Sequence, residues 1–190
     1  MKIKTLLGTK TVKLAIGAFA LATLLGGCGQ PDRYVDPEFK NAPAWVQMPK
    51  VEGKIAEMGS APKNAMGNFG FQRELAMANA RTNLAKRLNV KVKSMFKTYS
   101  SQTSANNGTF DMTAESVTKQ ITKQSLQGTT QEDAWTSPKG TFYVLMTIDP
   151  KSVASLMEKN AATAYQNDKA AYLKFQAAKA QGELTKELTK

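Results

Sequence analysis

The only cysteine of this 190-residue chain, Cys28, is the feature that most limits how the chain can fold. A single thiol cannot form a disulfide within the chain, so the fold must be held by noncovalent packing. Cys28 also ends an uncharged apolar run, residues 14–27, which follows a basic segment, residues 1–13, with four lysines and no acid. Polar sequence with prolines begins directly after it. We therefore expect the folded part of the chain to lie after Cys28.

The apolar run has the features of a secretory signal. It is shorter than the roughly 20 apolar residues that cross a bilayer, and it joins a basic segment to small residues at its end, as a cleaved signal does. The residues Leu25, Gly26, Gly27 and Cys28 resemble the lipobox of bacterial lipoproteins, whose small residues let the cleavage site enter the peptidase and whose thiol accepts diacylglycerol. A plain signal peptide with an incidental cysteine is the alternative. We expect residues 1–27 to be removed.

The lipobox resemblance implies that Cys28 becomes the N-terminus of the mature chain and carries diacylglycerol and an N-acyl chain. More than one acyl chain anchors a protein durably in a membrane. Gly29 stands where an Asp commonly retains lipoproteins of diderm bacteria in the inner membrane. The resemblance therefore also implies delivery to the outer membrane, with the periplasmic face and the cell surface both open.

Charge limits the partners that the mature chain could bind. The formal net charge is +11, and removal of residues 1–27 with their four lysines leaves +11 − 4 = +7. A basic surface attracts anionic partners such as lipopolysaccharide, acidic glycans or acidic protein faces. Nucleic acid is not expected as a partner, because the chain is exported and no nucleic-acid-binding motif accompanies the charge.

The chain contains no histidine, which is the usual general base and metal ligand near neutral pH. Together with a lone cysteine, this excludes Ser-His and Cys-His nucleophilic sites and most zinc sites. A hydrolase would need two carboxylates that face one cleft, whereas the adjacent Glu132 and Asp133 should point to opposite faces of a strand. We therefore expect no catalytic residue, no metal, no cofactor apart from the acyl chains, and no enzymatic activity.

Residues 28–50 predict an extended, lipidated tether. Prolines disfavour regular helix in this stretch: Pro31, Pro37, Pro43 and Pro49. Trp45 and Val46 interrupt it with large apolar side chains. We expect these two residues to pack back onto the domain, since large aromatics supply much buried area. An exposed tryptophan that stacks on a sugar is the alternative.

The strongest helical pattern covers residues 71–99. Apolar side chains recur there at steps of three and four: Ala78, Ala85, Leu88, Val92, Met95, Phe96 and Tyr99. The opposite face is basic: Lys86, Arg87, Lys91, Lys93 and Lys97. Such a face is either the solvated side that a surface helix needs or a binding surface for an anionic partner.

Glu74 and Arg81 lie seven residues apart in this helix, so both should project onto its apolar side. An unpaired charge in that position is costly, whereas a hydrogen-bonded pair is tolerated. We expect Arg81 to be partly buried and bonded to Glu74 or to a backbone carbonyl, as a structural pair.

Shorter elements surround this helix. In order, the pattern predicts a strand at 54–61, a loop at 62–70, the helix, a polar loop at 100–112 with Asn107-Gly108 as its turn, a helix at 113–125 capped by Thr113, and two strand-like runs at 126–137 and 140–149. The two runs flank a turn signal and predict a β-hairpin. The second run is apolar on both faces, as a central strand is.

The C-terminal part reads as one long helix. It begins at Asp149 and Pro150, and no helix breaker follows until Gly182. A helix of about 40 residues would span roughly 60 Å, which is longer than a domain of this size needs. An alanine recurs every seven residues: Ala164, Ala171 and Ala178. The distal part must therefore project, fold back or pack on another subunit.

Together these elements predict an α+β fold, in which a small antiparallel sheet of about three strands packs against helices and a long helix ends the chain. The predicted organisation is a signal peptide at 1–27, a tether at 28–50, an α+β domain at 51–157 and an alanine-rich C-terminal helix at 158–190.

The order of the elements, with "NAPAWV" at 41–46 and "ANARTNLAKRLNVKV" at 78–92, resembles the LPP20 lipoprotein family over residues 41–157. The residues that carry the resemblance are Pro43, Trp45, Ala80, Arg81, Leu84 and Ala85. It implies an α+β domain on the outer membrane. It also implies that some relatives build rings or discs around the flagellar motor and that others are surface antigens, and it implies no catalytic residue.

Two functions therefore compete. The one that we favour from the sequence is a non-catalytic structural lipoprotein that self-associates at the outer membrane, with a flagellum-associated scaffold as one form. The anchor and the overlong helix motivate it. The other is a monomeric envelope binding module, whose basic helix face holds an anionic glycan, lipopolysaccharide or a protein partner.

Overall fold

The computed structural model describes residues 36–99, 107–166, 168–180 and 182–189, which belong to one unit from Val35 to Lys190. The predicted signal peptide and the lipobox residues Leu25, Gly26, Gly27 and Cys28 lie outside the described residues. Among the helices of the described ranges, none is long and apolar enough to span a bilayer.

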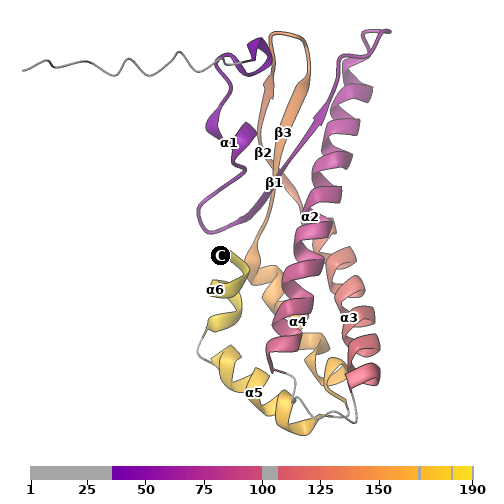
Figure 1. The fold of residues 1–190 in the computed structure, drawn as a ribbon, viewed down its shortest axis with the longest axis vertical. Coiled ribbons are helices and arrows are strands. Elements are labelled where there is room, and N and C mark those ends of the chain that lie inside the picture. Colours follow the sequence, from indigo (N-terminus) through magenta and orange to yellow (C-terminus); the bar gives the residue numbers. More distant parts are fainter. Residues whose placement is uncertain (1–35, 100–106, 167, 181, 190) are drawn as a thin grey trace, which may run out of the picture. The chain divides into compact units, whose positions relative to one another are not determined.

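The described elements combine helices with a small sheet (Figure 1). Their order is η1 (Pro37–Phe39), α1 (Ala44–Gln47), β1 (Ile55–Ala61), α2 (Phe69–Tyr99), α3 (Asn107–Gln127), β2 (Thr130–Thr136), β3 (Phe142–Ile148), α4 (Pro150–Ala164), α5 (Lys169–Ala180) and α6 (Glu183–Thr189). The predicted α+β class with a three-stranded antiparallel sheet is confirmed.

The sheet has the strand order β1-β3-β2, and β3 pairs antiparallel with both neighbours. β3 is thus the central strand that its apolar pattern predicts, and every residue in it is buried. The predicted hairpin joins β2 to β3. In its turn, Ser137 N donates to Thr141 O at 2.8 Å, and Gly140 takes a φ of +86°, which favours glycine.

One face of the sheet packs against α2. Ile55 of β1 and Val144 and Met146 of β3 belong to the main apolar core on this face. α2 approaches β1 so closely at Gly59 that an added Cβ would lie 2.2 Å from both Ala76 O and Ala80 N. The approach therefore requires a residue without a side chain at this position.

The other face of the sheet is covered by the segment before β1. Val46 of α1 is buried, the rings of Phe39 and Tyr143 pack with their centroids 6.4 Å apart, and Trp45 Nε1 donates to Asp133 Oδ2 at 2.7 Å. The prediction that Trp45 and Val46 pack back onto the domain is confirmed.

The buried face of α2 follows a single row of residues four apart. Its members are Gln72, Ala76, Ala80, Leu84, Leu88 and Val92, continued by Met95 and Phe96. The predicted apolar face is right from Leu88 onward and wrong at Ala78, which is exposed. The predicted face mixed steps of three and four, whereas the helix lays one i, i+4 ridge on the sheet.

Glu74 and Arg81 do not form the predicted buried pair. Both residues are exposed, and Arg81 Nε donates to Thr129 Oγ1 at 3.2 Å. The prediction was wrong because both positions lie off the buried row of α2, so neither charge has to leave water.

α3 begins at Asn107, six residues before the predicted start. Asn107 and Gly108 therefore open a helix instead of forming the turn of a loop, and Thr113 lies inside the helix instead of capping it. Val117 and Ile121 are buried as expected. Asn-Gly favours turns through its local conformational preference, but the packing of α3 along α2 and α4 outweighs that preference here.

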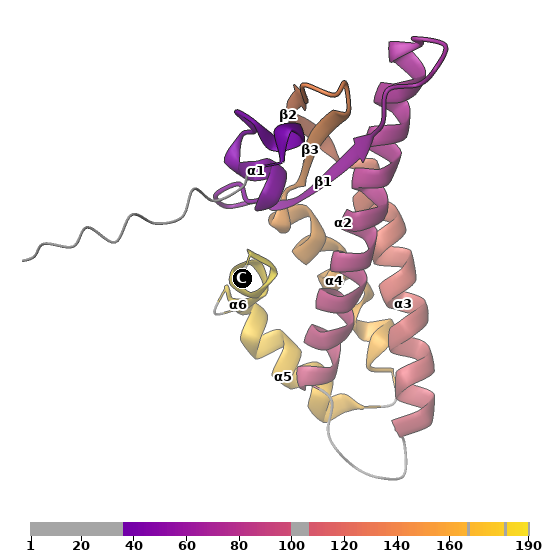
Figure 2. The same ribbon diagram turned by 45° about the horizontal axis from the view of Figure 1, so that its top comes forward.

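Three helices replace the single long C-terminal helix. Asp149 accepts from Lys151 N at 2.9 Å and caps α4. α4 ends at Ala164, and Asp168 then caps α5 by accepting from Ala171 N at 2.9 Å. Gly182, with a φ of +70°, precedes α6. Figure 2 shows α5 and α6 turning back beside α2 and α4, so the fold-back alternative is the one that occurs.

The fold-back buries the alanine side chains and an aromatic cluster. Ala164, Ala171 and Ala178 are all buried. The ring of Phe175 packs on that of Phe96, with centroids 6.0 Å apart, and Tyr165 OH donates to Phe96 O at 2.8 Å. The repeated alanines therefore serve close packing within the chain.

Candidate functional site

The five basic residues predicted to share one face of α2 point to different neighbours. Arg87 turns toward β1, where its Nη1 donates to Ala56 O at 3.1 Å and pairs with Glu57 Oε1 at 2.9 Å. Lys93 turns toward α3 and pairs with Glu115 Oε2 at 3.4 Å. These two cations are therefore already engaged in holding the fold.

Lys91 turns toward α6, where its Nζ donates to Glu187 O at 3.3 Å. Burial, followed by the nearby positive charge of Arg87, lowers the pKa of Lys91. Lys86 and Lys97 are the two exposed members of the predicted set. The predicted surface is thus dispersed, and Lys86 alone of the five lies in the groove described below.

A row of polar side chains on α2, one helical turn apart, covers the edge of β1. Asn79 donates to Ser60 O at 2.9 Å, Asn83 donates to Met58 O at 2.9 Å, and Arg87 donates to Ala56 O. These bonds satisfy carbonyls of an edge strand that would otherwise invite another strand. The row was not predicted, although its signal is visible as polar residues at i, i+4 and i+8.

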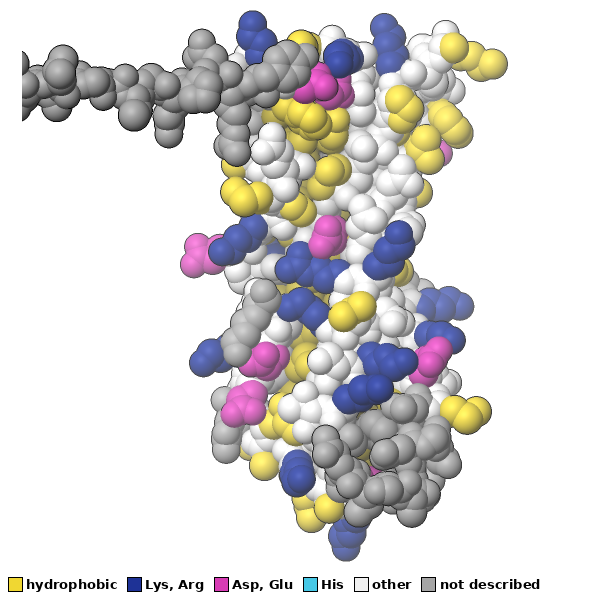
Figure 3. Space-filling view, in the orientation of Figure 1, with side chains coloured by type: hydrophobic (Ala, Val, Ile, Leu, Met, Phe, Trp, Pro, Cys, Tyr) yellow, Lys and Arg dark blue, Asp and Glu magenta, His cyan; other side chains and the backbone are white. Residues whose placement is uncertain are grey.

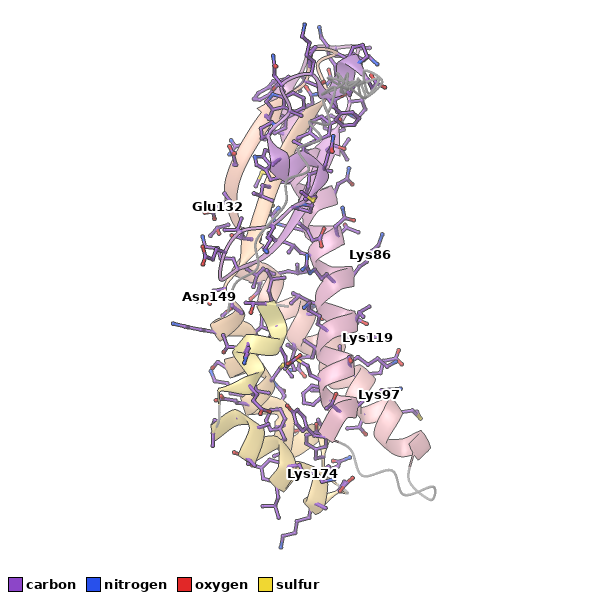
Figure 4. The ribbon with its side chains drawn as sticks, turned by 60° about the vertical axis from the view of Figure 1, so that its left-hand side comes forward. Lys86, Lys97, Lys119, Glu132, Asp149 and Lys174 are labelled. Atoms are coloured by element: carbon purple, nitrogen blue, oxygen red, sulfur yellow. The ribbon has the colours of Figure 1, made fainter. Side chains whose placement is uncertain are left out.

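α2 and α3 border a surface groove with a volume of about 540 Å³. Its apolar lining residues are Ala85, Val90 and Leu126. Lysines from both helices also line it: Lys86, Lys119 and Lys123. Figure 4 shows Lys86 and Lys119 along the same side of the unit. The two lysines of α3 were not predicted, because their approach to Lys86 depends on how α3 packs on α2.

The groove has positive charge and an unused hydrogen-bonding group. Lys119 pairs with Glu115 Oε1 at 2.9 Å, whereas Lys86 and Lys123 form no ion pair with any residue of the described ranges. Thr122 also lines the groove; it is only 7% exposed, and its Oγ1 has no hydrogen-bond partner among the described residues. Val90 is 69% exposed. The groove therefore suits an anionic partner that also has an apolar part.

The two adjacent acids considered for hydrolysis have structural partners. Lys54 Nζ donates to Glu132 Oε2 at 2.7 Å, and this hydrogen bond lowers the pKa of Glu132. Asp133 accepts the hydrogen bond from Trp45. Within the described ranges, no cluster of three or more His, Cys, Asp or Glu side chains could hold a metal ion.

The fold defines an α+β domain whose three antiparallel strands lie between a long helix and an N-terminal segment. A model of the LPP20 lipoprotein family matches residues 43–149, more than half of the chain, and the chain belongs to this family. The resemblance seen in the sequence is thereby confirmed. A search of curated proteins found no match. Membership of a lipoprotein family indicates a membrane-anchored protein of the cell envelope.

The family match covers α1 to β3 and ends at Asp149, before α4. Three residues that carry the resemblance have structural roles: Trp45 holds α1 to β2, and Ala80 and Leu84 belong to the buried row of α2. The groove between α2 and α3 also lies inside the matched region.

Proposed function

We propose that this protein is a non-catalytic lipoprotein of the outer membrane that is anchored through acylated Cys28 and binds an anionic envelope component in the α2–α3 groove. The lipobox resemblance and the lipoprotein family support the anchor. Gly29, in place of Asp, supports delivery to the outer membrane.

The groove is the observation that carries the binding role. Lys86 and Lys123 flank apolar side chains that remain open to solvent, and the buried hydroxyl of Thr122 lacks a partner among the described residues. Exposed cations attract anions over a distance, while a desolvated contact with Val90 and Leu126 adds apolar area. Lipopolysaccharide and the acidic peptide chains of peptidoglycan both combine negative charge with apolar groups.

Self-association as a scaffold, including a flagellum-associated one, has less support than binding. Its motive in the sequence was an overlong C-terminal helix with an alanine stripe. α4, α5 and α6 fold back, and the stripe is buried within the chain. Light scattering during size exclusion of residues 29–190 should give the mass of one chain at every concentration, whereas a larger mass would favour the scaffold.

The anchor is tested at its thiol. Replacement of Cys28 by Ser should abolish incorporation of radiolabelled palmitate and remove the protein from the outer-membrane fraction. Gly26→Ala keeps a small residue in the lipobox and serves as the control. An unlabelled wild-type chain, or a Cys28→Ser chain that fractionates like the wild type, would contradict the anchor.

The groove is tested by removing three of its charges and comparing the result with a control variant of the same net charge. A Lys86→Gln, Lys119→Gln, Lys123→Gln variant of residues 29–190 should lose retention on lipopolysaccharide or on peptidoglycan. The matched control replaces three exposed lysines of α4 and α5 by Gln: Lys151, Lys159 and Lys174. Full retention of the groove variant, or an equal loss in both variants, would show that the groove is not the binding site.

A further inference from the structure

A second surface lies where α2 begins. The loop after β1 and the first turns of α2 carry Met66, Phe69, Phe71 and Leu75, which are half of the exposed large apolar side chains in the described part of the chain. Met66 is 96% exposed. Figure 3 shows hydrophobic side chains gathered at this end of α2. Single exposed apolar residues are ordinary, but a cluster marks an interaction surface.

The loop holds this cluster in a defined conformation. Asn64 Oδ1 accepts from Asn68 N at 2.8 Å, and Asn64 Nδ2 donates to Asn68 O at 2.7 Å. Asn68 Oδ1 in turn accepts from Phe71 N at 3.0 Å, and Gly67 takes a φ of +66°. Met66 therefore projects from a turn that its own neighbours stabilise, so presenting it costs little ordering entropy.

The described chain begins at the same end of the unit (Figure 1). Asp36 Oδ1 pairs at 3.0 Å with Lys139 Nζ in the turn between β2 and β3. The next residue in that turn, Gly140, accepts at 2.8 Å from Gln72 Nε2 in the first turn of α2. The ring of Phe69 packs on Phe142 with centroids 5.1 Å apart. These contacts join Asp36 to the apolar cluster.

Chain length then limits where the membrane can be. Cys28 lies eight positions before Asp36, and eight residues span at most roughly 30 Å even when fully extended. α2 has 31 residues and extends roughly 46 Å from this end. The bilayer that holds the acyl chains therefore lies within roughly 30 Å of Asp36, at the end of the unit that carries the apolar cluster.

Basic side chains accompany the cluster. Lys63 is exposed and lies beside Gly140, where an added Cβ would be 3.0 Å from Lys63 Cδ. Arg73 is also exposed and donates to Gln131 Oε1 at 3.1 Å. Glu74 is an exposed acid nearby, whereas Asp36 is already paired. Apolar side chains with cations around them are typical of protein surfaces that bind anionic bilayers.

We propose that Met66, Phe69 and Phe71 insert into the interfacial layer of the membrane that carries the acyl anchor. This second contact orients the unit, and it places the centre of the α2–α3 groove at most roughly 27 Å further from the bilayer than Phe71, the rise of the 18 helical residues from Phe71 to Asn89. The inference rests on the anchor of the proposed function and is independent of what the groove binds.

The experiment uses the acylated protein in vesicles of phosphatidylethanolamine and phosphatidylglycerol. Because acylation blocks Cys28, a spin label attaches only to a thiol introduced by Met66→Cys. The control is Leu173→Cys on α5, an apolar position that is 59% exposed. Oxygen concentrates in the bilayer, whereas a nickel chelate stays in water. The ratio of oxygen to nickel accessibility should be several-fold higher at position 66 than at position 173.

Adding Phe71→Asp should lower that ratio at position 66 toward the control value, with circular dichroism confirming that the fold is kept. Equal ratios at positions 66 and 173, in protein that floats with the vesicles, overturn the membrane contact and leave the anchor intact. A label at position 66 that is shielded from both reagents indicates a protein partner and also overturns it. A protein that does not float with the vesicles overturns the anchor and the contact together.

Discussion

The two faces of the sheet are covered in different ways. On one face, α2 lies so close to β1 that Gly59 has no room for a Cβ, and the side chains that meet there are apolar. On the other face, the buried side chain of Val46 and several polar contacts together hold residues 36–48. Tyr143 OH donates to Glu38 Oε1 at 3.0 Å, and Trp45 donates to Asp133.

The two faces of the sheet therefore have different roles: the face toward α2 forms the core of the fold, and the other face holds the N-terminal segment, residues 36–48. Close apolar packing depends on shape and tolerates little change in volume. Hydrogen bonds near the surface exchange with water and contribute less. The face toward α2 should therefore decide whether the domain folds, and the other face should decide how firmly the segment that leads to Cys28 is held against it.

The largest effect is expected at Gly59. Gly59→Ala places a Cβ 2.2 Å from backbone atoms of α2, which must then move away from the sheet. The free energy of unfolding in urea should fall by about 3 kcal/mol or more. Gly128→Ala is the control, since its added Cβ would meet only Ser125 O at 3.6 Å. Similar stability of both variants would mean that α2 does not depend on this contact.

A smaller loss is expected on the opposite face. Val46→Ala removes a buried side chain between α1 and the sheet, and should lower the free energy of unfolding by about 2 kcal/mol through lost burial and the cavity left behind. Met48→Ala, at a position that is 72% exposed, should change it little. A loss at Val46 that equals the loss at Gly59 would remove the distinction between the two faces.

Alkaline pH probes Tyr143 on the sheet and Tyr165, which packs against Phe96 of α2. Burial, followed by the hydrogen bond to Glu38, raises the pKa of Tyr143 to about 12. Burial also raises the pKa of Tyr165. The folded chain holds these protons more tightly than the unfolded chain, whose tyrosines titrate near 10.0. Their contribution to stability is therefore complete below that pH and is lost as the pH rises toward 12.

Urea unfolding measured from pH 8 to pH 11 checks this loss. Tyr143→Phe and Tyr165→Phe should each flatten the alkaline decline, because a phenylalanine has no proton to release in the unfolded chain. Tyr172, a half-buried tyrosine, serves as the control through Tyr172→Phe. An alkaline decline in stability that is unchanged in both test variants would show that it does not come from Tyr143 and Tyr165.

The smallest effect is expected at Trp45. Trp45→Phe keeps the aromatic ring but removes the hydrogen bond to Asp133, and should lower the free energy of unfolding by about 1 kcal/mol or less. Asp133→Asn retains an acceptor oxygen and should cost less still. Protease cleavage between residues 36 and 48 should increase in Trp45→Phe, whereas an unchanged rate would show that this bond does not hold the segment.

Local pattern predicted the sheet well. The apolar residues of β3 and the turn after Ser137 are short-range signals, and both the hairpin and the central position of β3 are confirmed. The sequence pattern gave part of the buried face of α2 wrongly, because two different rows of residues fit the same helical period. Ala78 and Arg81 suit an apolar face by spacing alone, yet only packing against β1 selects the row through Ala80 and Leu84.

The end of α4 and two of the three groove lysines were not predicted, for a related reason. Nothing between Tyr165 and Asp168 is a glycine or a proline, so the end of α4 carries no strong local signal. The aromatic side chain of α2 that packs on this end of α4, Phe96, is brought there only by the tertiary structure. In the groove, Lys86 was among the predicted residues, whereas Lys119 and Lys123 join it through the packing of α3.

By itself the sequence determined the three-stranded sheet and the long helix beside it, the absence of histidine and the fact that no disulfide can close within the chain. Only the tertiary structure decided which cations stay free, which glycine is indispensable and where the C-terminal helices turn. The physical reason is that helical and strand periods follow from neighbours along the chain. The burial and charge pairing of a side chain depend on atoms that distant segments bring to it.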